Sequence, residues 1–319
     1  MTKARRVKSR RIKPFELVLP ATSANLGPAF DAAALALDLY LKIQARPARE
    51  FSLAAKGRDA AICAEPAHNL ILNTYREVLQ AEGREVVPLA LRMQNEIPIG
   101  KGCGSSAAAR LAGIALAVHF GRLSWNDDEI IAEGSRREHH PDNASACWLG
   151  GVTVARMSAG QVQAVRVRPA GQWPLLLAVP EEKLSTQEAR RVLPQQYSKA
   201  DAVANIQNSM LLLAALFQGR HELLATALDD RIHQPYRAPL CPLLPALQEL
   251  SGQRGILGVA LSGAGPSVLI FLDPGSVLSR CRKVISTHLL RQGLKGELIA
   301  AAITARGAGR FAPGRKSRT

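Results

Sequence analysis

The sequence lacks several features of membrane-embedded and disordered proteins. Its most apolar helical run, residues 210–217, is far shorter than the roughly 18 consecutive apolar residues that a spanning helix needs. Aromatic residues make up only 4% of the chain, yet 47% of its 319 residues are hydrophobic, which is enough to bury a core. The sequence therefore predicts a globular protein outside the membrane, built as one large domain or two ordinary ones.

Cysteine is scarce, and no two cysteines form a CxxC pair. The five cysteines are widely separated, at Cys63, Cys103, Cys147, Cys241 and Cys281. A secretory signal is also missing, because the apolar residues at 15–19 are interrupted by Glu16 and ended by Pro20. We therefore expect reduced thiols and a cytoplasmic location.

Acidic residues are missing from both ends of the chain. Residues 1–13 carry seven lysines and arginines, residues 306–319 carry five, and neither segment contains an aspartate or glutamate. The two ends thus supply 12 of the formal net charge of +15, and the body between them is nearly balanced. Terminal charge runs are usually solvated, so we expect two basic tails, the first disordered, with at most a weak affinity for nucleic acid.

Strand-like and helix-like segments follow one another without a regular alternation. Apolar and polar residues alternate over 89–94, as in a half-buried strand, and the Ala/Leu-rich segment 107–120 is typical of a buried helix. The mixture favours an α+β protein of two domains, divided where Pro169, Gly171 and Pro174 cluster. We expect a tail at 1–13, domains at 14–168 and 169–305, and a tail at 306–319. Further strands are expected at 15–20, 152–154, 162–167, 175–179, 258–261 and 267–272, and further helices at 127–137, 203–228 and 277–291.

A glycine-rich segment lies between a predicted strand and a predicted helix. Its glycines let backbone N–H groups turn inward around an anion, and the first turn of the following helix adds unpaired donors and the positive end of its dipole. It is not a Walker loop, because Gly102 follows Lys101, and it is not a dinucleotide-binding GxGxxG loop. The segment predicts a phosphate-binding turn, with a flexible turn capped by serine as the alternative. Its residues are Pro98, Ile99, Gly100, Lys101, Gly102, Cys103, Gly104, Ser105, Ser106, Ala107 and Ala108.

Two other segments are weaker when taken singly. The stretch 262–267, which contains Gly263 and Gly265, lies between two apolar strands and would suit an ordinary hairpin turn. The stretch 20–31 is polar and rich in turn residues, and Asn25 and Asp31 within it are residue types that often serve as turn or cap residues.

Together and in this order, the three segments resemble the three motifs of the GHMP small-molecule kinases. The middle one matches the pattern PxxxGLGSSAA, with Cys103 where leucine is usual. The first is close to PATSANLGPGFD, which is characteristic of homoserine kinases, with Ala29 in place of the last glycine. Three more stretches, 140–143, 185–194 and 230–237, resemble HxDNVAP, STxxARxxLP and DxxHEPYR of that group.

The resemblance implies a two-domain GHMP kinase fold. Its N-terminal domain would be similar to the second domain of ribosomal protein S5 and its C-terminal domain would be ferredoxin-like, with ATP and the second substrate in the cleft between them. The backbone at 100–107 would hold the triphosphate together with Gly263 and Gly265, and Asn69 would lie in the adenine pocket.

The resemblance also places the catalytic roles on Ser106, Glu133 and Asn143. Ser106 or its neighbour Ser105 would hold Mg²⁺ together with a helix carboxylate, for which Glu133 is the first candidate and Glu138 the second. The general base stays open, because no residue matches the catalytic aspartate of mevalonate-type relatives. The proton of the acceptor hydroxyl can then pass to the γ-phosphate or to solvent.

L-homoserine offers three groups for recognition, and the resemblance supplies a partner for each. Arg190 and Arg237 can fork onto the α-carboxylate, and Asp31 can hold the ammonium. Asn25, His140, Asn143 and Thr186 complete the expected substrate-binding set.

These residues predict a homoserine kinase that uses ATP and Mg²⁺ to phosphorylate the L-homoserine hydroxyl in threonine biosynthesis. Two alternatives stay open. One is another GHMP kinase with an isoprenoid or sugar substrate, and the other is a nucleic-acid-binding protein on a degenerate kinase fold. The sequence leaves the oligomeric state undecided, with a homodimer as one option.

Overall fold

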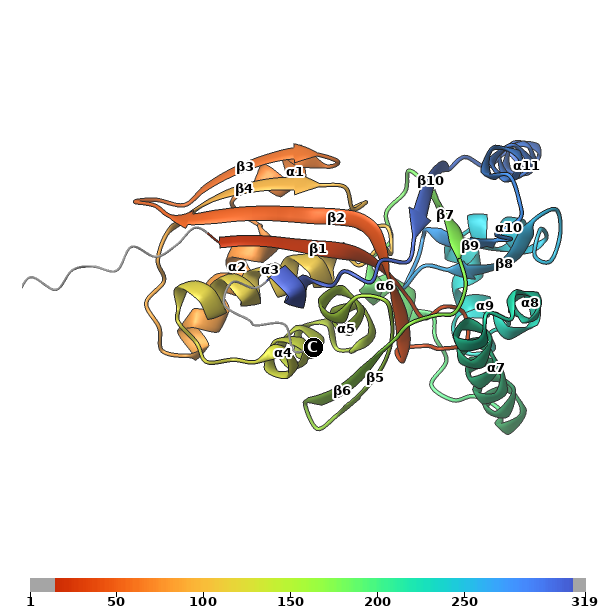
Figure 1. Ribbon diagram of the computed structural model, residues 1–319, viewed down its shortest axis with the longest axis horizontal. Helices are drawn as coiled ribbons and strands as arrows, with labels where there is room; N and C mark the ends of the chain where they lie inside the picture. The colour runs from red at the N-terminus through yellow and green to blue at the C-terminus, as the bar shows by residue number, and fades with distance from the viewer. Residues whose placement is uncertain (1–14, 312–319) are drawn as a thin grey trace, which may run out of the picture.

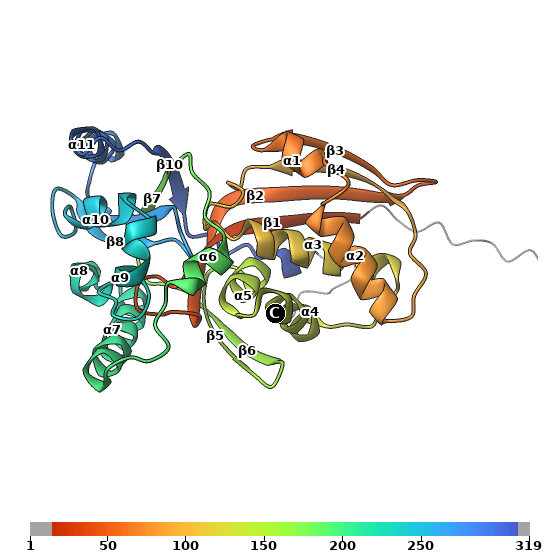
Figure 2. The same ribbon diagram turned by 180° about the vertical axis from the view of Figure 1, so that it is seen from behind.

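The computed structural model describes residues 15–311, which form two β-sheets with helices packed around them (Figure 1). The N-terminal half holds the first sheet and the C-terminal half the second, and the two halves lie side by side in both views (Figure 2). This arrangement confirms the prediction of an α+β protein with two domains. The predicted tail at 1–13 lies outside the described residues.

The first sheet has six strands and is centred on a long strand, β2. The strand order is β3-β4-β2-β5-β6, and β1 also pairs with β2. All pairs are antiparallel except β3 with β4. The register of β1 on β2 shifts between Pro20 and Ala21, and residues 21–24 stay paired with residues 34–37 of β2. The strands are β1 (Phe15–Ala24), β2 (Ala33–Pro47), β3 (Ser52–Gly57), β4 (Leu89–Asn95), β5 (Val152–Ser158) and β6 (Gln161–Val167).

Helices of the N-terminal half pack against this sheet. In Figure 1, α2, α3, α4 and α5 lie on the lower side of the sheet, with α3 against α2 and β1. Helix α3 is rich in alanine and leucine and is buried along most of its length, as its composition predicts. Helix α4 starts with a capping box between Asn126 and Glu129. The helices are α1 (Ala60–Ala64), α2 (Leu70–Ala81), α3 (Ser105–Phe120), α4 (Asp127–Glu138) and α5 (Asp142–Leu149).

The second sheet has four antiparallel strands in the order β10-β7-β9-β8. Its strands are β7 (Pro174–Val179), β8 (Ile256–Leu261), β9 (Val268–Leu272) and β10 (Glu297–Ala302). The helices of this half are α6 (Thr186–Arg191), α7 (Lys199–Gln218), α8 (Leu224–Ala227), α9 (Gln234–Arg237), α10 (Leu243–Gln248) and α11 (Leu278–Arg291). Short 3₁₀ turns are η1 (His221–Leu223), η2 (Ala238–Leu240) and η3 (Ala308–Phe311).

Two sequence expectations need correction. The apolar run 210–217 is part of a longer helix, α7, whose 20 residues make it long and apolar enough to cross a membrane by length and composition alone. Only 22% of its apolar window is buried inside the molecule, and a single helix of this kind is weak evidence for a membrane span. The predicted C-terminal tail also begins too early, because residues 307 and 308 are buried and η3 packs on β1 and α5. Small residues at 307–309 allow this close packing, which the charge pattern could not indicate.

Candidate active site

A cavity of about 410 Å³ lies where the two halves of the molecule meet. All three glycine-bearing segments of the sequence line it, together with α6 and the start of α5. Segments that are more than 200 residues apart in the chain therefore build one site.

Direct hydrogen bonds join the three segments. The Thr22 N–H donates to the carbonyl of Cys103 (3.1 Å), and the Gly263 N–H donates to the carbonyl of Ala24 (3.0 Å). The Ser262 hydroxyl lies 2.8 Å from the carbonyl of Gly102 and so links the last segment to the middle one. These contacts fix the three turns relative to one another, as a site for a large anion requires.

Two positions of the middle segment require glycine because atoms of the other two segments lie very close to their backbone. Both have positive φ, +76° at Gly102 and +70° at Gly104. A Cβ at Gly102 would lie 2.2 Å from the carbonyl oxygen of Ser262, and one at Gly104 would lie 1.9 Å from Oγ1 of Thr22. Any side chain here would push the segments apart.

The middle segment leads directly into the N-terminus of α3. Gly104 is the N-cap, no side chain caps the helix, and its first turn holds no acidic residue. The free N–H groups and the positive end of the dipole are therefore available to an anion. Gly100, Gly102, Ser105 and Ser106 line the cavity beside this turn.

Lys101 does not point into this turn. Its ammonium donates to the carbonyls of Pro180 (3.0 Å), Glu181 and Glu182 (2.6 Å). Burial, together with the charge of Lys183, lowers the pKa of Lys101. The side chain thus ties the middle segment to the loop after β7, and only its backbone belongs to the expected phosphate cradle.

The cavity also carries apolar side chains. Its lining includes Leu41, Ile62, Ile71, Met93 and Ile97. Asn69 lines the cavity with them and acts as the N-cap of α2, accepting from the N–H of Leu72 (3.2 Å) while its amide donates to the carbonyl of Cys63 (2.9 Å). Apolar lining in the same cavity as an anion cradle suits a flat base attached to phosphates.

An acidic residue lies beside the cradle, but it is not the first one expected. The Ser106 hydroxyl donates to Oε2 of Glu138 (2.8 Å), and Arg110 donates to Oε1 of the same carboxylate (2.6 Å). Glu133 instead pairs with Arg136 and Arg137 at 2.6 Å and does not line the cavity. Of the two acidic candidates for the metal site, the structure therefore places the second, Glu138, at the cavity and the first, Glu133, away from it.

A buried polar cluster joins the first segment to α5. The Thr22 hydroxyl donates to the side-chain carbonyl of Asn143 (2.5 Å), whose backbone N–H donates to Asp142 (2.6 Å). Nδ1 of His140 lies 2.5 Å from the same Asp142 oxygen. Burial opposes the charged form of His140, but the hydrogen bond to Asp142 and the nearby charges of Asp142, Asp31 and Glu138 outweigh it and raise its pKa.

Asp31 lies close to this cluster, with a carboxylate oxygen within 4.8 Å of ligand atoms of His140 and Asp142. Arg190 on α6 pairs with Asp31 at 2.6 Å. The guanidinium carbons of Arg190 and Arg237 lie 5.4 Å and 5.3 Å from the ring centroid of Phe30, so both stack on it. Asn25 holds the loop before Asp31 in place. Its side-chain carbonyl accepts from the N–H of Asp31 (2.9 Å), and its amide donates to the carbonyl of Gly263 (2.8 Å).

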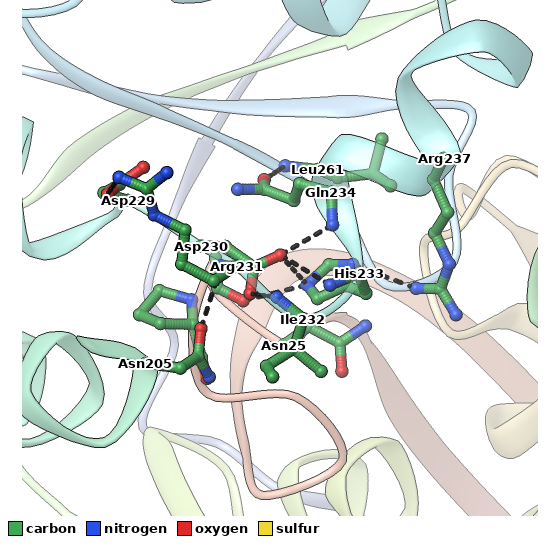
Figure 3. Close-up of polar contacts among 12 residues, drawn as sticks. Asn25, Asn205, Asp229, Asp230, Arg231, Ile232, His233, Gln234, Arg237 and Leu261 are labelled. Carbon is green, nitrogen blue, oxygen red and sulfur yellow. Dashed lines mark hydrogen bonds and ion pairs between the residues drawn. The ribbon is translucent and has the colours of Figure 1, made fainter. Parts of the chain in front are cut away.

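Hydrogen bonds fix the side chain of Arg237, and one of its partners is His233 in the same segment, 230–237 (Figure 3). It is almost fully buried, and its Nε donates to the carbonyl of Ala189 (3.0 Å). Its Nη1 lies 3.1 Å from Nδ1 of His233, which must accept because a guanidinium has no acceptor. Burial and the charge of Arg190 lower the pKa of Arg237 to about 10, so the side chain stays charged at neutral pH.

His233 is fixed in one neutral tautomer by its neighbours. Its Nε2 donates to the carbonyl of Gly27 (2.8 Å) while Nδ1 accepts from Arg237. Burial lowers the pKa of His233 to about 4, although Asp230 opposes this shift. Asp230 itself accepts from the backbone N–H groups of Ile232, His233 and Gln234 and so closes the turn before α9 (Figure 3).

Most of the residues proposed from the sequence line this one cavity. They are Asn25, Asp31, Asn69, Ile99, Gly100, Gly102, Gly104, Ser105, Ser106, His140, Asn143, Thr186, Arg190, Arg237, Gly263 and Gly265. Pro98, Lys101, Cys103, Ala107, Ala108 and Glu133 do not line it. The sequence reading missed Thr22, Phe30, Asp142 and His233, all of which lie within the matched motifs but gave no separate signal.

Known proteins share this architecture and these motifs. The family model for the GHMP kinases N terminal domain matches residues 69–151, and that for the GHMP kinases C terminal domain matches residues 212–288. The homoserine kinase of Solibacter usitatus is 45% identical over 82% of this chain and 86% of its own length, and that of Deinococcus radiodurans is 35% identical over 92% and 96%. The crystal structure of homoserine kinase from Cytophaga hutchinsonii superposes with a TM-score of 0.76 at 21% identity, covering 96% of this chain and 99% of that one. The similarity extends over both halves of the molecule.

Proposed function

We propose a mechanism from the premise that this chain belongs to the GHMP kinases and, within them, to the homoserine kinases. It is a phosphotransferase that moves a phosphoryl group from ATP to the hydroxyl of L-homoserine, a step of threonine biosynthesis. The roles assigned below to individual residues, to Mg²⁺ and to the location of the protein are proposals.

The triphosphate of ATP lies, in this proposal, on the turn at 100–107. The free N–H groups at the start of α3 and the helix dipole stabilise its negative charge. The adenine packs on the apolar lining and Asn69, and Gly263 and Gly265 close the turn from the C-terminal half. The support for this placement is that the anion cradle and the apolar side chains line one cavity.

The donor set beside the cradle fits Mg²⁺. A hydroxyl and a carboxylate, those of Ser106 and Glu138, lie 2.8 Å apart, and hard oxygen ligands are what Mg²⁺ prefers. When bound there, the ion would neutralise charge on the transferring phosphoryl group. Arg110 orients the Glu138 carboxylate through an ion pair of 2.6 Å.

L-homoserine binds, we infer, where Asp31 and Arg190 now pair. A zwitterion can insert between them, because its ammonium replaces Arg190 at Asp31 and its carboxylate replaces Asp31 at Arg190. Arg237, already charged, desolvated and held by His233, completes the carboxylate site. This pair of opposite charges beside the phosphate cradle is the observation that carries the substrate assignment.

Catalysis in this proposal rests on positioning and charge stabilisation. Asn143 and His140, both fixed by Asp142, face the cavity and orient the acceptor hydroxyl. The Asn143 carbonyl accepts from Thr22, and the Asn143 amide donates one N–H to Asp142 (3.3 Å), so its second N–H is the group proposed to face the substrate. Phosphoryl transfer through a loose transition state needs little help from a base, and the proton leaves to the γ-phosphate or to solvent.

The location is proposed as cytoplasmic, because all five cysteines, which the structure describes, are free thiols.

An ADP-release assay with Mg²⁺ across L-homoserine, mevalonate, galactose and diphosphocytidyl-methylerythritol tests the substrate. We expect rapid release with L-homoserine alone. A preference for another of the four would overturn the substrate assignment and leave the GHMP kinase family in place.

A further inference from the structure

The loop after β7 is fastened to the phosphate turn at two points. The N–H of Leu184 donates to the carbonyl of Gly100 (3.3 Å). In the other direction, the Lys101 ammonium donates to the backbone carbonyls of residues 180–182. A loop of the C-terminal half is therefore held directly against the turn that is proposed to bind the triphosphate.

Lys183 is the residue of this loop whose side chain packs beside the turn. Its Cδ, Cγ and Cβ lie 3.5, 3.6 and 3.8 Å from the position that a Cβ at Gly100 would occupy. These are ordinary van der Waals distances, so the aliphatic stem lies along the Gly100 backbone. The next three residues, 184–186, line the cavity, while Lys183 itself is exposed beside them. The ammonium is only two bonds beyond Cδ and can turn toward the cavity.

The Lys183 ammonium has no carboxylate partner. Among residues 15–311 no ion pair of 4.0 Å or less includes it, although Glu181 and Glu182 come just before it in the chain. After burial, the charge of Lys183 is the next cause that lowers the pKa of Lys101, so the two ammonium groups repel each other. A polyanion bound on the turn would relieve this repulsion.

The phosphate turn supplies no cationic side chain of its own. Lys101 is the one lysine or arginine in the segment 98–108, and its ammonium is turned away to backbone carbonyls. Arg110, further along α3, is paired with Glu138. The N–H groups of the helix start carry only partial charges. Phosphoryl transfer needs positive charge around the moving group, because negative charge shifts toward the leaving oxygen.

We propose that Lys183 is a further catalytic residue, whose ammonium contacts the β- and γ-phosphates of ATP from the C-terminal half, and that Lys101 positions it. This inference rests on the proposed function. A lysine suits the task, because a compact charge on a flexible four-carbon stem can follow the phosphoryl group. Helix α6 begins at Thr186 and lies between the two halves in both views (Figures 1 and 2). The same loop thus places Lys183 at the phosphates and Arg190 at the amino acid.

Nucleotide binding without homoserine tests the contact separately from turnover. The ligands are AMPPNP, an ATP analogue whose γ-phosphoryl group is not transferred, and AMP, which lacks the β- and γ-phosphates. Calorimetric titration of the full chain with Mg²⁺, with AMP measured by competition, gives both dissociation constants. Lys183→Met keeps an apolar stem and removes the charge, so it should weaken AMPPNP binding about tenfold or more and leave AMP binding within about twofold.

Two further variants separate charge from shape. Lys183→Arg keeps the charge and should retain most of the wild-type affinity for AMPPNP. Lys283→Met is the matched control, because Lys283 is an exposed lysine on α11, at the periphery of the C-terminal half (Figure 1). It should bind both nucleotides as the wild type does.

Steady-state kinetics give a second readout. Lys183→Met should lower kcat by about 30-fold or more and change the KM for homoserine by less than about threefold, because the ammonium stabilises charge on the phosphates and does not touch the amino acid. Lys283→Met should leave kcat and both Michaelis constants unchanged.

A double-mutant cycle tests the positioning role of Lys101. Lys101→Met should also weaken AMPPNP relative to AMP, and this effect should disappear in the Lys183→Met background, where no charge is left to position. An equal loss in both backgrounds would overturn the positioning role. Lys183 is exposed, so its variants decide the contact with the phosphates even if Lys101→Met does not fold.

The outcomes separate this inference from the proposed function. A Lys183→Met variant that binds AMPPNP and turns over as the wild type does would overturn the inference and leave the kinase assignment in place. A loss of AMP binding equal to the loss of AMPPNP binding would also overturn it, because the effect would then not come from the β- and γ-phosphates. A wild type that binds neither nucleotide would overturn both.

Discussion

The hydroxyl of Ser106, at the start of α3, donates a 2.8 Å hydrogen bond to the carboxylate of Glu138, at the end of α4. This contact brings two oxygen ligands together beside the phosphate cradle. The second Glu138 oxygen is held by Arg110, so the carboxylate has one orientation. The metal-binding role proposed here depends on this relationship.

Glu138→Gln should lower kcat by about 100-fold or more, with a smaller change in the KM for homoserine, because a neutral amide holds Mg²⁺ poorly while charge moves to the leaving oxygen. Glu133→Gln is the matched control, since Glu133 also pairs with arginines on α4 but does not line the cavity. Its kcat should stay within about twofold of the wild type. Steady-state kinetics at several Mg²⁺ concentrations decide the matter, and the opposite pattern would return the metal role to Glu133.

Arg190→Ala and Arg237→Ala should raise the KM for homoserine by about 30- to 1,000-fold and leave the KM for ATP nearly unchanged. The carboxylate they bind keeps its charge during the reaction, and one charged hydrogen-bonding partner is worth about 2 to 4 kcal/mol. Lysine should rescue neither, because an ammonium cannot reproduce the guanidinium fork.

Arg191→Ala is the control for this pair, because Arg191 is exposed on the same helix, α6. It should match the wild type in both Michaelis constants. Circular dichroism checks that Arg237→Ala, which empties a buried position, is still folded. An arginine variant that alters only the KM for ATP would contradict the carboxylate assignment for that residue.

His233 should stay neutral, as the Nε2–H tautomer, down to about pH 5. Its pKa is lowered to about 4 from the ordinary value near 6.5, so the unfolded chain gains a proton before the folded chain does. The stability that depends on neutral His233 is thus complete above pH 6.5 and is lost as the pH falls toward 4, by about 3 kcal/mol in all. The ring nitrogen shifts in ¹⁵N NMR report both tautomer and titration, and protonation near pH 6.5 would contradict this account.

His139→Gly should stabilise the protein by about 0.5 to 1 kcal/mol. His139 ends α4 in the left-handed region, with φ of 65°, where a Cβ is unfavourable and glycine is preferred. The side chain is exposed, so little contact is lost. Urea unfolding compares it with His139→Ala, which keeps the Cβ and should show no gain. A glycine variant less stable than the alanine variant would refute the argument.

The three glycine segments could be recognised from the sequence because their function depends on backbone geometry. Positive φ at Gly102 and Gly104 and the free N–H groups of a helix start leave a direct trace in residue type. The strand before this segment and the helix after it also follow from local pattern, and the structure places them at 89–95 and 105–120.

The choice between Glu133 and Glu138 could not be made in this way. The two residues lie five positions apart on α4, which rotates their side chains by about 140° around the helix axis. Which of the two faces α3 depends on how α4 packs, and that is decided by tertiary contacts. The direction of the Lys101 side chain could not be predicted from local sequence either, because the carbonyls that bind its ammonium come from residues 180–182, about 80 positions away.

The central claim, that the cavity selects a zwitterionic amino alcohol for phosphorylation, is tested most directly with two analogues of L-homoserine. One is 4-hydroxybutanoate, which lacks the ammonium that Asp31 would hold, and the other is 3-aminopropan-1-ol, which lacks the carboxylate that Arg190 and Arg237 would hold. Measured as formation of the phosphomonoester by ³¹P NMR with ATP and Mg²⁺, kcat/KM for L-homoserine should exceed that for each analogue by about 1,000-fold or more. An analogue phosphorylated within tenfold of L-homoserine, or no phosphomonoester from L-homoserine itself, would contradict the claim.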